Sequence, residues 1–387
     1  MNRICRMLAV VCVVYVLSVC AIACGGGGSS SAEQTDTPPV TTSPSLTISP
    51  TASPSPTPTQ TPDNKVRSAL FPSDWTPSYT DGQGRYLPDF SYAGYRYGAG
   101  IPAAAGATFE VEDFGADPTG QGDSTAAFQA AIDAASDAGG GRVVAGEGLF
   151  RLDGRITVTH SNVQIEGAGP QLSRIYFTSF EGMTGRAHIQ FAGSSNRGAE
   201  LLLATDCEAR SNTVEIADAS ALEVGDEVVL GCVITSEFVA EHNMTGTWQA
   251  FNGTWQVFAR REVVDIDIAA EPDVVTLDVP VRYPMKVRDS ASLKAESGYL
   301  TNVGIRDIGV ANAIAWADAW SEERVHVVEF RSVKDSWAFN VHSFNPPSAP
   351  ENGYGSEDHL QSGGIHVELS KRVTVAECVM VEAQNRG

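Results

Sequence analysis

The sequence predicts an all-β protein in which short strands stack as successive turns of a solenoid. After residue 108, short segments of alternating apolar and polar residues are separated by Gly, Asp and Asn turns. From residue 301 on, a strand pattern also repeats, because VGIRDI at 303–308 aligns with VHVVEF at 325–330 and with VTVAEC at 373–378. Such units stack into one continuous core, and no single unit could fold alone.

In this alignment the steps are 22 and 48 residues, the second being close to two turns plus an insertion. Apolar residues at positions one, three and six are expected to point inward, and the pair between three and six to form a turn. Asp307, Glu329 and Glu377 share that turn position and could form an acidic ladder. The solubility of a turn explains these residues better than catalysis does.

The segment 108–170 predicts a strand, a shaped turn, one helix and four further strands. The strand 109–111 runs into a turn rich in Gly, Pro and Asp, and Asp123 or Ser124 can then cap a helix over 124–138. The helix has one apolar stripe, and Gly139 suits its left-handed end. The stripe comprises Phe128, Ala131, Ile132 and Ala135, and the later strands are 142–144, 150–152, 156–158 and 163–165.

FEVEDFGADPTGQGDSTAAFQAAIDAASDAGGG and the following RVVAGEGLFRLDGRITVTHSNVQIEGAG closely resemble the first segment of the pectate-lyase-like superfamily over roughly 60 residues. The resemblance implies a right-handed parallel β-helix whose first turn is capped by the helix 124–138. Two positions depart from the family pattern, since 118–120 reads Pro-Thr-Gly instead of Gly-Asp-Gly and Gly146 replaces a proline. The motif identifies a scaffold and not a reaction.

Residues 1–24 read as a secretion signal, with Arg3 and Arg6 before an apolar run from 7 to 22. Ala-Ile-Ala-Cys at 21–24 resembles a bacterial lipobox, although alanine stands where leucine is usual. The resemblance implies cleavage before Cys24, lipidation of that cysteine and, with Gly25 next, delivery to the outer membrane. The alternative is an ordinary signal cut after Ala23.

Two segments separate this signal from the solenoid. Residues 25–64 are rich in Gly, Ser, Pro and Thr and predict a disordered tether. Residues 65–107 carry many aromatic side chains without periodicity, so we expect an extended arm packed along the first turns of the β-helix. These aromatics could instead stack on sugar rings.

The solenoid pattern, which we assign to 108–199, is interrupted at 200–285, where strands at 212–216, 222–230, 263–268 and 274–279 predict a small antiparallel β insert. Residues 286–387 return to β-helix turns. The strand 373–381 is followed by six residues, too few for the polar cap that a solenoid needs. We therefore expect the chain to be an N-terminal fragment and part of the site to lie beyond Gly387.

The formal charge of −21 argues against nucleic acid as a partner, because such binding needs a basic surface. A polyanionic substrate would also be repelled unless calcium or a local basic patch intervened, so Ca²⁺ is a possible cofactor. Cys207 and Cys232 could form a disulfide, whereas Cys378 is expected to be a buried thiol. Cysteine and histidine spacing predicts no structural zinc or other metal site.

The candidate site lies around 346–364, which replaces regular strand sequence and brings Glu357 and two neighbouring titratable residues. Outward-facing polar residues surround it, as they would on any β-helix, so solvent exposure alone could explain each of them. The candidate catalytic residues are Asp335, His342, Asp358, His359 and Glu368. The candidate substrate-binding residues are Trp316, Trp320, His326, Lys334 and His366.

Carboxylates one or two strands apart would satisfy the spacing for glycoside hydrolysis, and a base with a cation would satisfy β-elimination. We therefore predict a secreted, lipid-anchored protein of the bacterial envelope that degrades a polysaccharide as a glycoside hydrolase or polysaccharide lyase. The alternative is a non-catalytic carbohydrate-binding or adhesive β-helix. In both cases the lipid would be the only membrane contact.

Overall fold

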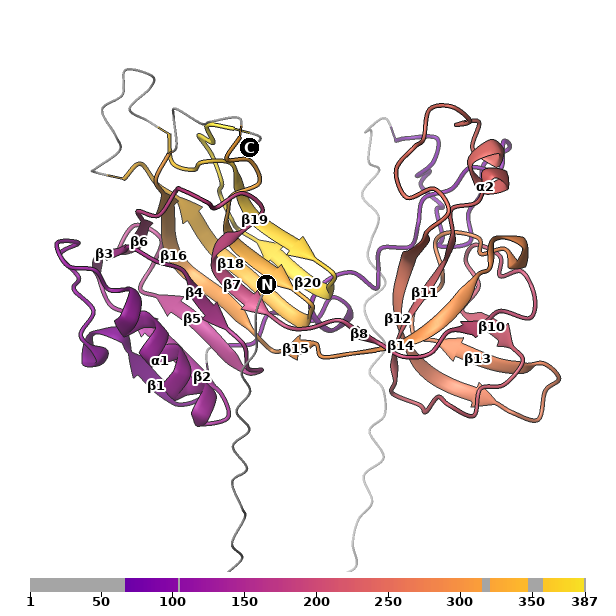
Figure 1. Ribbon diagram of the computed structural model, residues 1–387, viewed down its shortest axis with the longest axis horizontal. Coiled ribbons are helices and arrows are strands. Elements are labelled where there is room, and N and C mark those ends of the chain that lie inside the picture. The colour runs from indigo at the N-terminus through magenta and orange to yellow at the C-terminus, as the bar shows by residue number, and fades with distance from the viewer. Residues whose placement is uncertain (1–66, 104, 315–320, 347–357, 386–387) are drawn as a thin grey trace, which may run out of the picture. The chain divides into compact units, whose positions relative to one another are not determined.

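A computed structural model of the chain describes residues 67–103, 105–314, 321–346 and 358–385 (Figure 1). The signal, the whole tether, Cys24, Trp316, Trp320 and Glu357 lie outside these residues. Within the described ranges, no helix is both long and apolar enough to cross a membrane.

The predicted helix is α1, Thr125–Asp137, and its predicted stripe is buried together with Ala127. Its N-cap residue is Ser124, whose side chain makes no capping bond, while Oδ1 of the preceding Asp123 accepts the backbone N–H of Thr125 at 2.9 Å. At the other end, Gly139 has a φ of 81° and donates to Ser136 O, while Gly140 donates to Ala135 O. This pair of bonds is the Schellman ending that glycine favours. Helix α1 contacts β1 and β2, which begin the solenoid (Figure 1).

The solenoid is a parallel β-helix, which confirms the predicted fold class. In the largest sheet, parallel strands pair in the order β1-β2-β5-β16-β18-β20. In the same sheet β3 pairs with β6, and β6 pairs with β16. Strands β4, β7, β17 and β19 form a separate parallel sheet. The strands are β1 Thr108–Glu110, β2 Gly141–Ala145, β3 Gly148–Leu152, β4 Ile156–Val158, β5 Val163–Gly167, β6 Ser173–Phe177, β7 Ala187–Ala192, β15 Leu300–Thr301, β16 Gly304–Asn312, β17 His326–Arg331, β18 Val333–Ser343, β19 Gly363–Glu368 and β20 Lys371–Ala376.

The repeat alignment is wrong at its middle member. Ile305 of β16 pairs with Ala338 of β18, and Ala338 pairs with Val375 of β20, so 303–308 and 373–378 are two turns apart. The segment 325–330 belongs instead to β17 in the four-stranded sheet. Glu329 therefore lies inside β17, whereas Asp307 lies within β16 at a φ of 53° and Glu377 follows β20 at a φ of 55°.

The β-helix has one apolar core that runs along the stack from α1 to β20. Phe191 of β7 and Phe330 of β17 are fully buried in it, with ring centroids 4.7 Å apart and planes 4° from parallel. Parallel pairing places equivalent side chains directly above one another, so this core is a set of stacked rows.

The insert is antiparallel, as predicted, and has a separate core. Its sheet runs β10-β13-β12-β11-β14-β8, with β9 paired to β14, so strands on both sides of the predicted range 200–285 take part. The elements are β8 Asn196–Arg197, β9 Leu201–Leu202, β10 Thr213–Ile216, β11 Glu227–Val233, α2 Ser236–Glu241, β12 Trp255–Asp267, β13 Asp273–Leu277 and β14 Ser292–Ser297. Cys207 and Cys232 are both buried here as free thiols, so the disulfide considered above is not formed.

The arm packs along the β-helix, but its buried residue Tyr95 lies against the last turns, β18 and β20, and not against the first turns as predicted. The arm also contacts the insert. Tyr95 is buried edge-on against Trp337, and its hydroxyl donates to Asn302 at 3.1 Å. On the insert, Arg210 lies 3.7 Å from the centroid of the Tyr86 ring. Short 3-10 helices occur at Tyr95–Tyr97, Val111–Phe114 and Val287–Asp289.

Candidate functional site

A row of polar residues crosses the four-stranded sheet. Thr157 of β4 pairs with Gln190 of β7, Gln190 with Glu329 of β17, and Glu329 with His366 of β19. The flanking row, which contains Phe191 and Phe330, is buried in the core. Because successive strand residues alternate between faces, the polar row lies on the opposite face from that core row.

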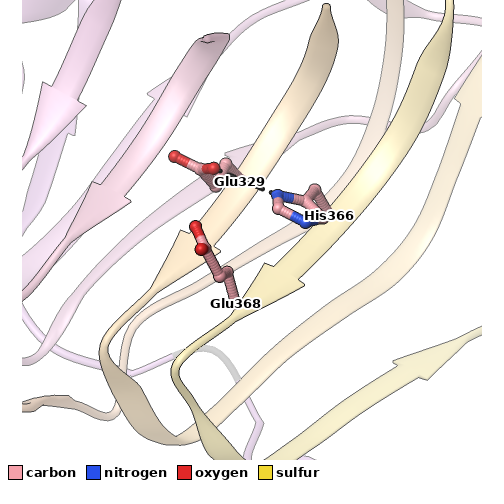
Figure 2. Close-up of side chains that lie close together, drawn as sticks. All are labelled: Glu329, His366 and Glu368. Atoms are coloured by element: carbon pink, nitrogen blue, oxygen red, sulfur yellow. Dashed lines mark hydrogen bonds and ion pairs between the residues drawn. The ribbon is translucent and has the colours of Figure 1, made fainter. Parts of the chain in front are cut away.

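Glu329, His366 and Glu368 form a cluster at the β19 end of this row, which we call the Glu–His–Glu cluster. Figure 2 shows the three side chains converging from the two neighbouring strands. One oxygen of each carboxylate and one imidazole nitrogen all lie within 4.8 Å of one another. The side chain of Glu329 is only 5% exposed, while that of His366 is 36% exposed and open to a ligand.

Hydrogen bonds fix the orientation of this cluster. Nδ1 of His366 lies 3.1 Å from Oε1 of Glu329, while the side-chain amide of Gln190 donates to Oε2 of Glu329 at 2.5 Å. If the carboxylate accepts the Nδ1 proton, the lone pair of the neutral imidazole is on Nε2. A buried acceptor beside a partly exposed imidazole is the arrangement of a positioned general base.

Cationic and aromatic groups border the cluster. Nη1 of Arg331 forms an ion pair with Oε2 of Glu368, and both side chains are partly exposed. The His326 ring stacks on that of His366 with centroids 4.2 Å apart. Burial lowers the pKa of His326 to about 4, with a further contribution from His366, so His326 is neutral at physiological pH.

The donor set of the cluster suits some cations better than others. One imidazole and two carboxylates resemble the mixed nitrogen and oxygen sites of transition metals. Calcium takes six to eight oxygen ligands, and the cluster offers only two carboxylates. The residues therefore do not fit the Ca²⁺ considered as a cofactor, and no chemical step is derived through it.

A shallow polar cavity of about 400 Å³ lies beside Arg331. Its lining combines three serines with two guanidinium groups and little apolar surface. The lining residues are Gly193, Ser194, Ser195, Arg197, Arg331, Ser332 and Leu369. A hydroxylated ligand with a carboxylate would find both kinds of partner here.

Two other predicted residues are held in ion pairs. Asp335 receives two hydrogen bonds from Arg372, at 2.8 and 2.9 Å, and Lys334 donates to Glu227 of the insert at 2.7 Å. The first contact lies between β18 and β20 of the β-helix, and the second joins β18 to the insert. They give both side chains a structural role that does not depend on a substrate.

The remaining predicted residues lie on β18 or near the end of the described chain. His342 contacts the carbonyl oxygen of Glu377 through Nε2 at 3.1 Å, and His359 contacts Ser343 through Nδ1 at 3.1 Å. Burial raises the pKa of Asp358, and the nearby carboxylate of Glu382 raises it further. No contact shown here joins these three to the Glu–His–Glu cluster.

The structure thus brings together three of the predicted site residues, His326, His366 and Glu368. Sequence reasoning missed Glu329, which it assigned to a turn, and it did not consider Arg331. The signal that could have found them was strand register, because Glu329 and His366 are 37 residues apart and lie side by side on adjacent turns. The catalytic and binding roles of all these residues remain predictions.

Comparison with known families confirms the pectate-lyase-like resemblance for one part of the chain. Residues 108–219 match the family model described as "Rhamnogalacturonase A/epimerase, pectate lyase-like". This segment contains α1, the first turns of the β-helix and the beginning of the insert.

Curated relatives match a short segment. Mannuronan C5-epimerase AlgE3 of Azotobacter vinelandii is 52% identical over 68 residues, which are 16% of this chain and 4% of that protein. Alginate lyase 7 of the same organism is 46% identical over 67 residues, which are 16% of this chain and 8% of the lyase. The chain thus spans a small part of each relative.

Solved structures align over more of the chain at low identity. The tailspike protein gp49 from Pseudomonas phage LKA1 is 17% identical with a TM-score of 0.40, covering 70% of this chain and 50% of the tailspike. The A-module of Azotobacter vinelandii mannuronan C-5 epimerase AlgE4 is 14% identical with a TM-score of 0.26, covering 72% of this chain and 52% of the module.

Proposed function

We propose that this chain is a polysaccharide lyase that acts on a uronate-containing glycan at the Glu–His–Glu cluster. The observation that carries the proposal is the hydrogen bond between the buried carboxylate of Glu329 and Nδ1 of the exposed His366. A base positioned in this way, beside the cation Arg331, has the parts that β-elimination needs. The names of the curated relatives, a mannuronan epimerase and an alginate lyase, support a uronate as substrate.

In the proposed reaction, Nε2 of His366 removes the proton on C5, next to the uronate carboxylate. The C–H electron pair forms the double bond between C4 and C5, and the C4–O bond breaks. The leaving oxygen takes the electron pair and then a proton from water. Arg331 faces the substrate carboxylate and stabilises the charge that develops on it. Glu329 touches no substrate atom and acts as a positioning residue for His366.

The test offers mannuronan and polygalacturonate separately to the full chain. β-Elimination gives an unsaturated product that absorbs in the ultraviolet, whereas hydrolysis gives reducing ends without that absorbance. Epimerisation would exchange the C5 hydrogen for deuterium in heavy water without cleavage. Reducing ends without absorbance would overturn the lyase and favour a hydrolase that uses Glu329 and Glu368.

Variants connect the activity to the cluster. His366→Gln should lower turnover roughly 10²–10⁴-fold, the usual contribution of a general base. Glu329→Gln should shift the pH profile of turnover as well as its rate, which a structural role alone would not do. His160→Gln is the matched control, because His160 is exposed and lies outside the cluster. Thermal unfolding of each variant separates lost activity from lost fold.

A second candidate is a non-catalytic glycan-binding protein. The observation that favours it is that the cluster's polar groups already have protein partners, since Glu329 is bonded to Gln190 and His366, and Glu368 to Arg331. Saturable binding to either glycan without any of the three products would establish this alternative.

We also propose that Cys24 is lipidated and tethers the chain to the bacterial envelope. The support is the Ala-Ile-Ala-Cys boundary at 21–24 followed by a Gly/Ser/Pro/Thr-rich segment. Cys24→Ala should move the protein from the membrane fraction to the soluble fraction. A wild-type protein that is already soluble would contradict the anchor.

A further inference from the structure

A second cavity, which shares no lining residue with the Glu–His–Glu cluster, is strongly basic. It has a volume of about 410 Å³ and is lined by five cationic side chains and one carboxylate, Asp278. The cations are Arg260, Arg261, Arg282, Lys371 and Arg372. Such a concentration is unexpected in a chain of net charge −21 and indicates a specific role.

Two of these cations are neutralised within the protein. Arg372 forms ion pairs with Asp335 at 2.8 Å and with Glu262 at 3.1 Å, and Lys371 pairs with Glu227. They hold the last turn of the β-helix against the insert. Their positive charge is therefore not available to a ligand.

The other three cations are arginines whose guanidinium groups are only partly engaged by the protein. Nε of Arg260 pairs with Glu296 at 3.1 Å, but its Nη2 is buried without a hydrogen-bond partner among the described residues. Arg261 donates from all three guanidinium nitrogens, to the backbone carbonyls of Val279, Arg260 and Pro280. The guanidinium of the exposed Arg282 lies 5.0 Å from the centroid of the Phe90 ring. In the described part of the chain, neither Arg261 nor Arg282 has a carboxylate within ion-pair distance.

The basic cavity continues into a neighbouring one of about 290 Å³, because the two share Tyr92, Val279 and Arg282. The second cavity contains Tyr86 and Arg210, whose guanidinium lies over the tyrosine ring and donates to the carbonyl oxygens of Ser78 and Tyr79. We call the two cavities together the arginine groove. It combines guanidinium groups with tyrosine rings, and the carboxylates of Asp278 and Asp89 also line it.

We propose that the arginine groove binds the carboxylate groups of an acidic polysaccharide at a site separate from the Glu–His–Glu cluster. Guanidinium N–H groups match a carboxylate in bidentate geometry, and tyrosine rings offer flat surfaces for the apolar faces of sugar rings. A carboxylate would also supply the acceptor that Nη2 of Arg260 lacks. A local basic groove lets an acidic chain approach a protein whose overall charge repels it.

The proposal shares a ligand class with the proposed lyase but does not depend on its chemistry, because the groove and the cluster have no residue in common. Binding is therefore measured in the full chain carrying His366→Gln, so that turnover cannot consume the ligand. The ligands are a mannuronan oligosaccharide, the same oligosaccharide with its carboxyl groups reduced to alcohols, and inorganic sulfate. Titration calorimetry gives each affinity.

Arg282→Gln should weaken binding of the acidic oligosaccharide about tenfold, the effect of losing one charge-assisted contact. Arg260→Lys keeps a cation beside Glu296 while removing Nη2 and should weaken binding about fivefold. Arg288→Gln is the matched control, because it removes the same charge from an exposed arginine of the insert that pairs with Glu241 instead. It should leave the affinity unchanged.

We expect the reduced oligosaccharide to bind at least about tenfold more weakly than the acidic one. Equal affinity of the two would overturn the proposal, since the groove would then recognise rings and not carboxylates. Unchanged affinity in both Arg282→Gln and Arg260→Lys would place the ligand elsewhere. Sulfate binding as tightly as the oligosaccharide would reduce the groove to a general anion site.

Discussion

The β-helix and the insert build their cores in opposite ways. In the β-helix, parallel strands stack residues that are far apart in sequence, such as Glu329 and His366, which are 37 residues apart. In the insert, antiparallel strands such as β12 and β13 pair across a short connection. The two cores have no residue in common.

This difference separates two kinds of functional surface. Stacking in register makes aligned rows, and one such row places the Glu–His–Glu cluster on adjacent strands. Most arginines of the arginine groove come from the insert, where β12 and the segment after β13 supply Arg260, Arg261 and Arg282. The β-helix thus supplies the residues of the candidate active site. The insert supplies most of the arginines of the candidate binding groove.

The largest expected effect comes from breaking the β-helix at its capped end. Ile132→Asp puts a carboxylate into the buried face of α1, where Ile132 is 1% exposed. An unpaired buried charge costs several kcal/mol, and the strand edges that α1 covers would invite association. We expect aggregation or loss of the β-helix by size-exclusion chromatography.

Asp137→Asn, on the exposed side of α1, is the control and should behave as wild type. A soluble Ile132→Asp protein with an unchanged melting temperature would contradict the capping role of α1.

The next prediction tests whether the two cores unfold separately. Phe330→Ala in the β-helix should cost about 3–5 kcal/mol and Leu293→Ala in the insert about 2–5 kcal/mol, because both side chains are fully buried. If the cores are independent, calorimetry will show two transitions and each variant will lower only one. A single transition that falls in both variants would show that the contacts of Arg372 and Lys334 couple the regions.

Acid should affect the β-helix before the insert. Burial lowers the pKa of His188 to about 4 from 6.5, so the folded state prefers neutral imidazole. The contribution of this preference to the free energy of unfolding amounts to roughly 3 kcal/mol. It is complete above pH 6.5 and is lost as the pH falls toward 4. In the insert, burial raises the pKa of Glu296, but hydrogen bonds from Ser195 and Tyr299 outweigh burial and lower the pKa overall. The stability that the Glu296 carboxylate contributes is therefore lost only below about pH 4.5.

The melting temperature of the β-helix transition should therefore fall first as the pH is lowered. His188→Gln should reduce that dependence and leave the part that comes from His326, whose pKa burial also lowers to about 4, whereas His160→Gln, at an exposed position, should not change it. Parallel loss of both transitions from pH 6.5 downward would contradict the assignment to His188.

The smallest effects concern bends. Glu377 is exposed and has a φ of 55°, a conformation that disfavours a side chain, so Glu377→Gly should stabilise the β-helix by up to about 1 kcal/mol. In the insert, Gly253 has a φ of 74° with open space around it, so Gly253→Ala should cost about 1 kcal/mol. Chemical denaturation measures both, and a destabilised Glu377→Gly protein would show that the side chain contributes to the bend.

The sequence predicted the local features of the fold well. Helix α1 and its buried stripe, the first four strands after it and the antiparallel insert all follow from periodicity and turn residues, which act over short distances. The register of the later turns could not be predicted in this way, because it is fixed by contacts between residues 33 to 37 positions apart in the sequence. For this reason the repeat pattern aligns 325–330 with 303–308 and 373–378, although 325–330 belongs to the four-stranded sheet and the other two belong to the largest sheet.

The candidate site was predicted only in part for the same reason. Histidine and carboxylate residues on outward positions can be read from strand patterns, and this identified His326, His366 and Glu368. Whether two such residues meet depends on the number of residues in each turn. Glu329 became visible as a member of the cluster only once β17 and β19 were paired.

The ends of the insert have a consequence for how such a protein can change over evolution. Asn196 of β8 pairs with Ser297 of β14, and Ser194 donates to the carbonyl oxygen of Gly298 at 2.8 Å, so the chain leaves and re-enters the β-helix at one point. A segment attached in this way is a cassette, which can be exchanged, enlarged or lost while β5, β16 and β18 keep their register. Recombination at the 194–298 junction can thus replace most of the arginine groove without disturbing the row of side chains that carries the Glu–His–Glu cluster.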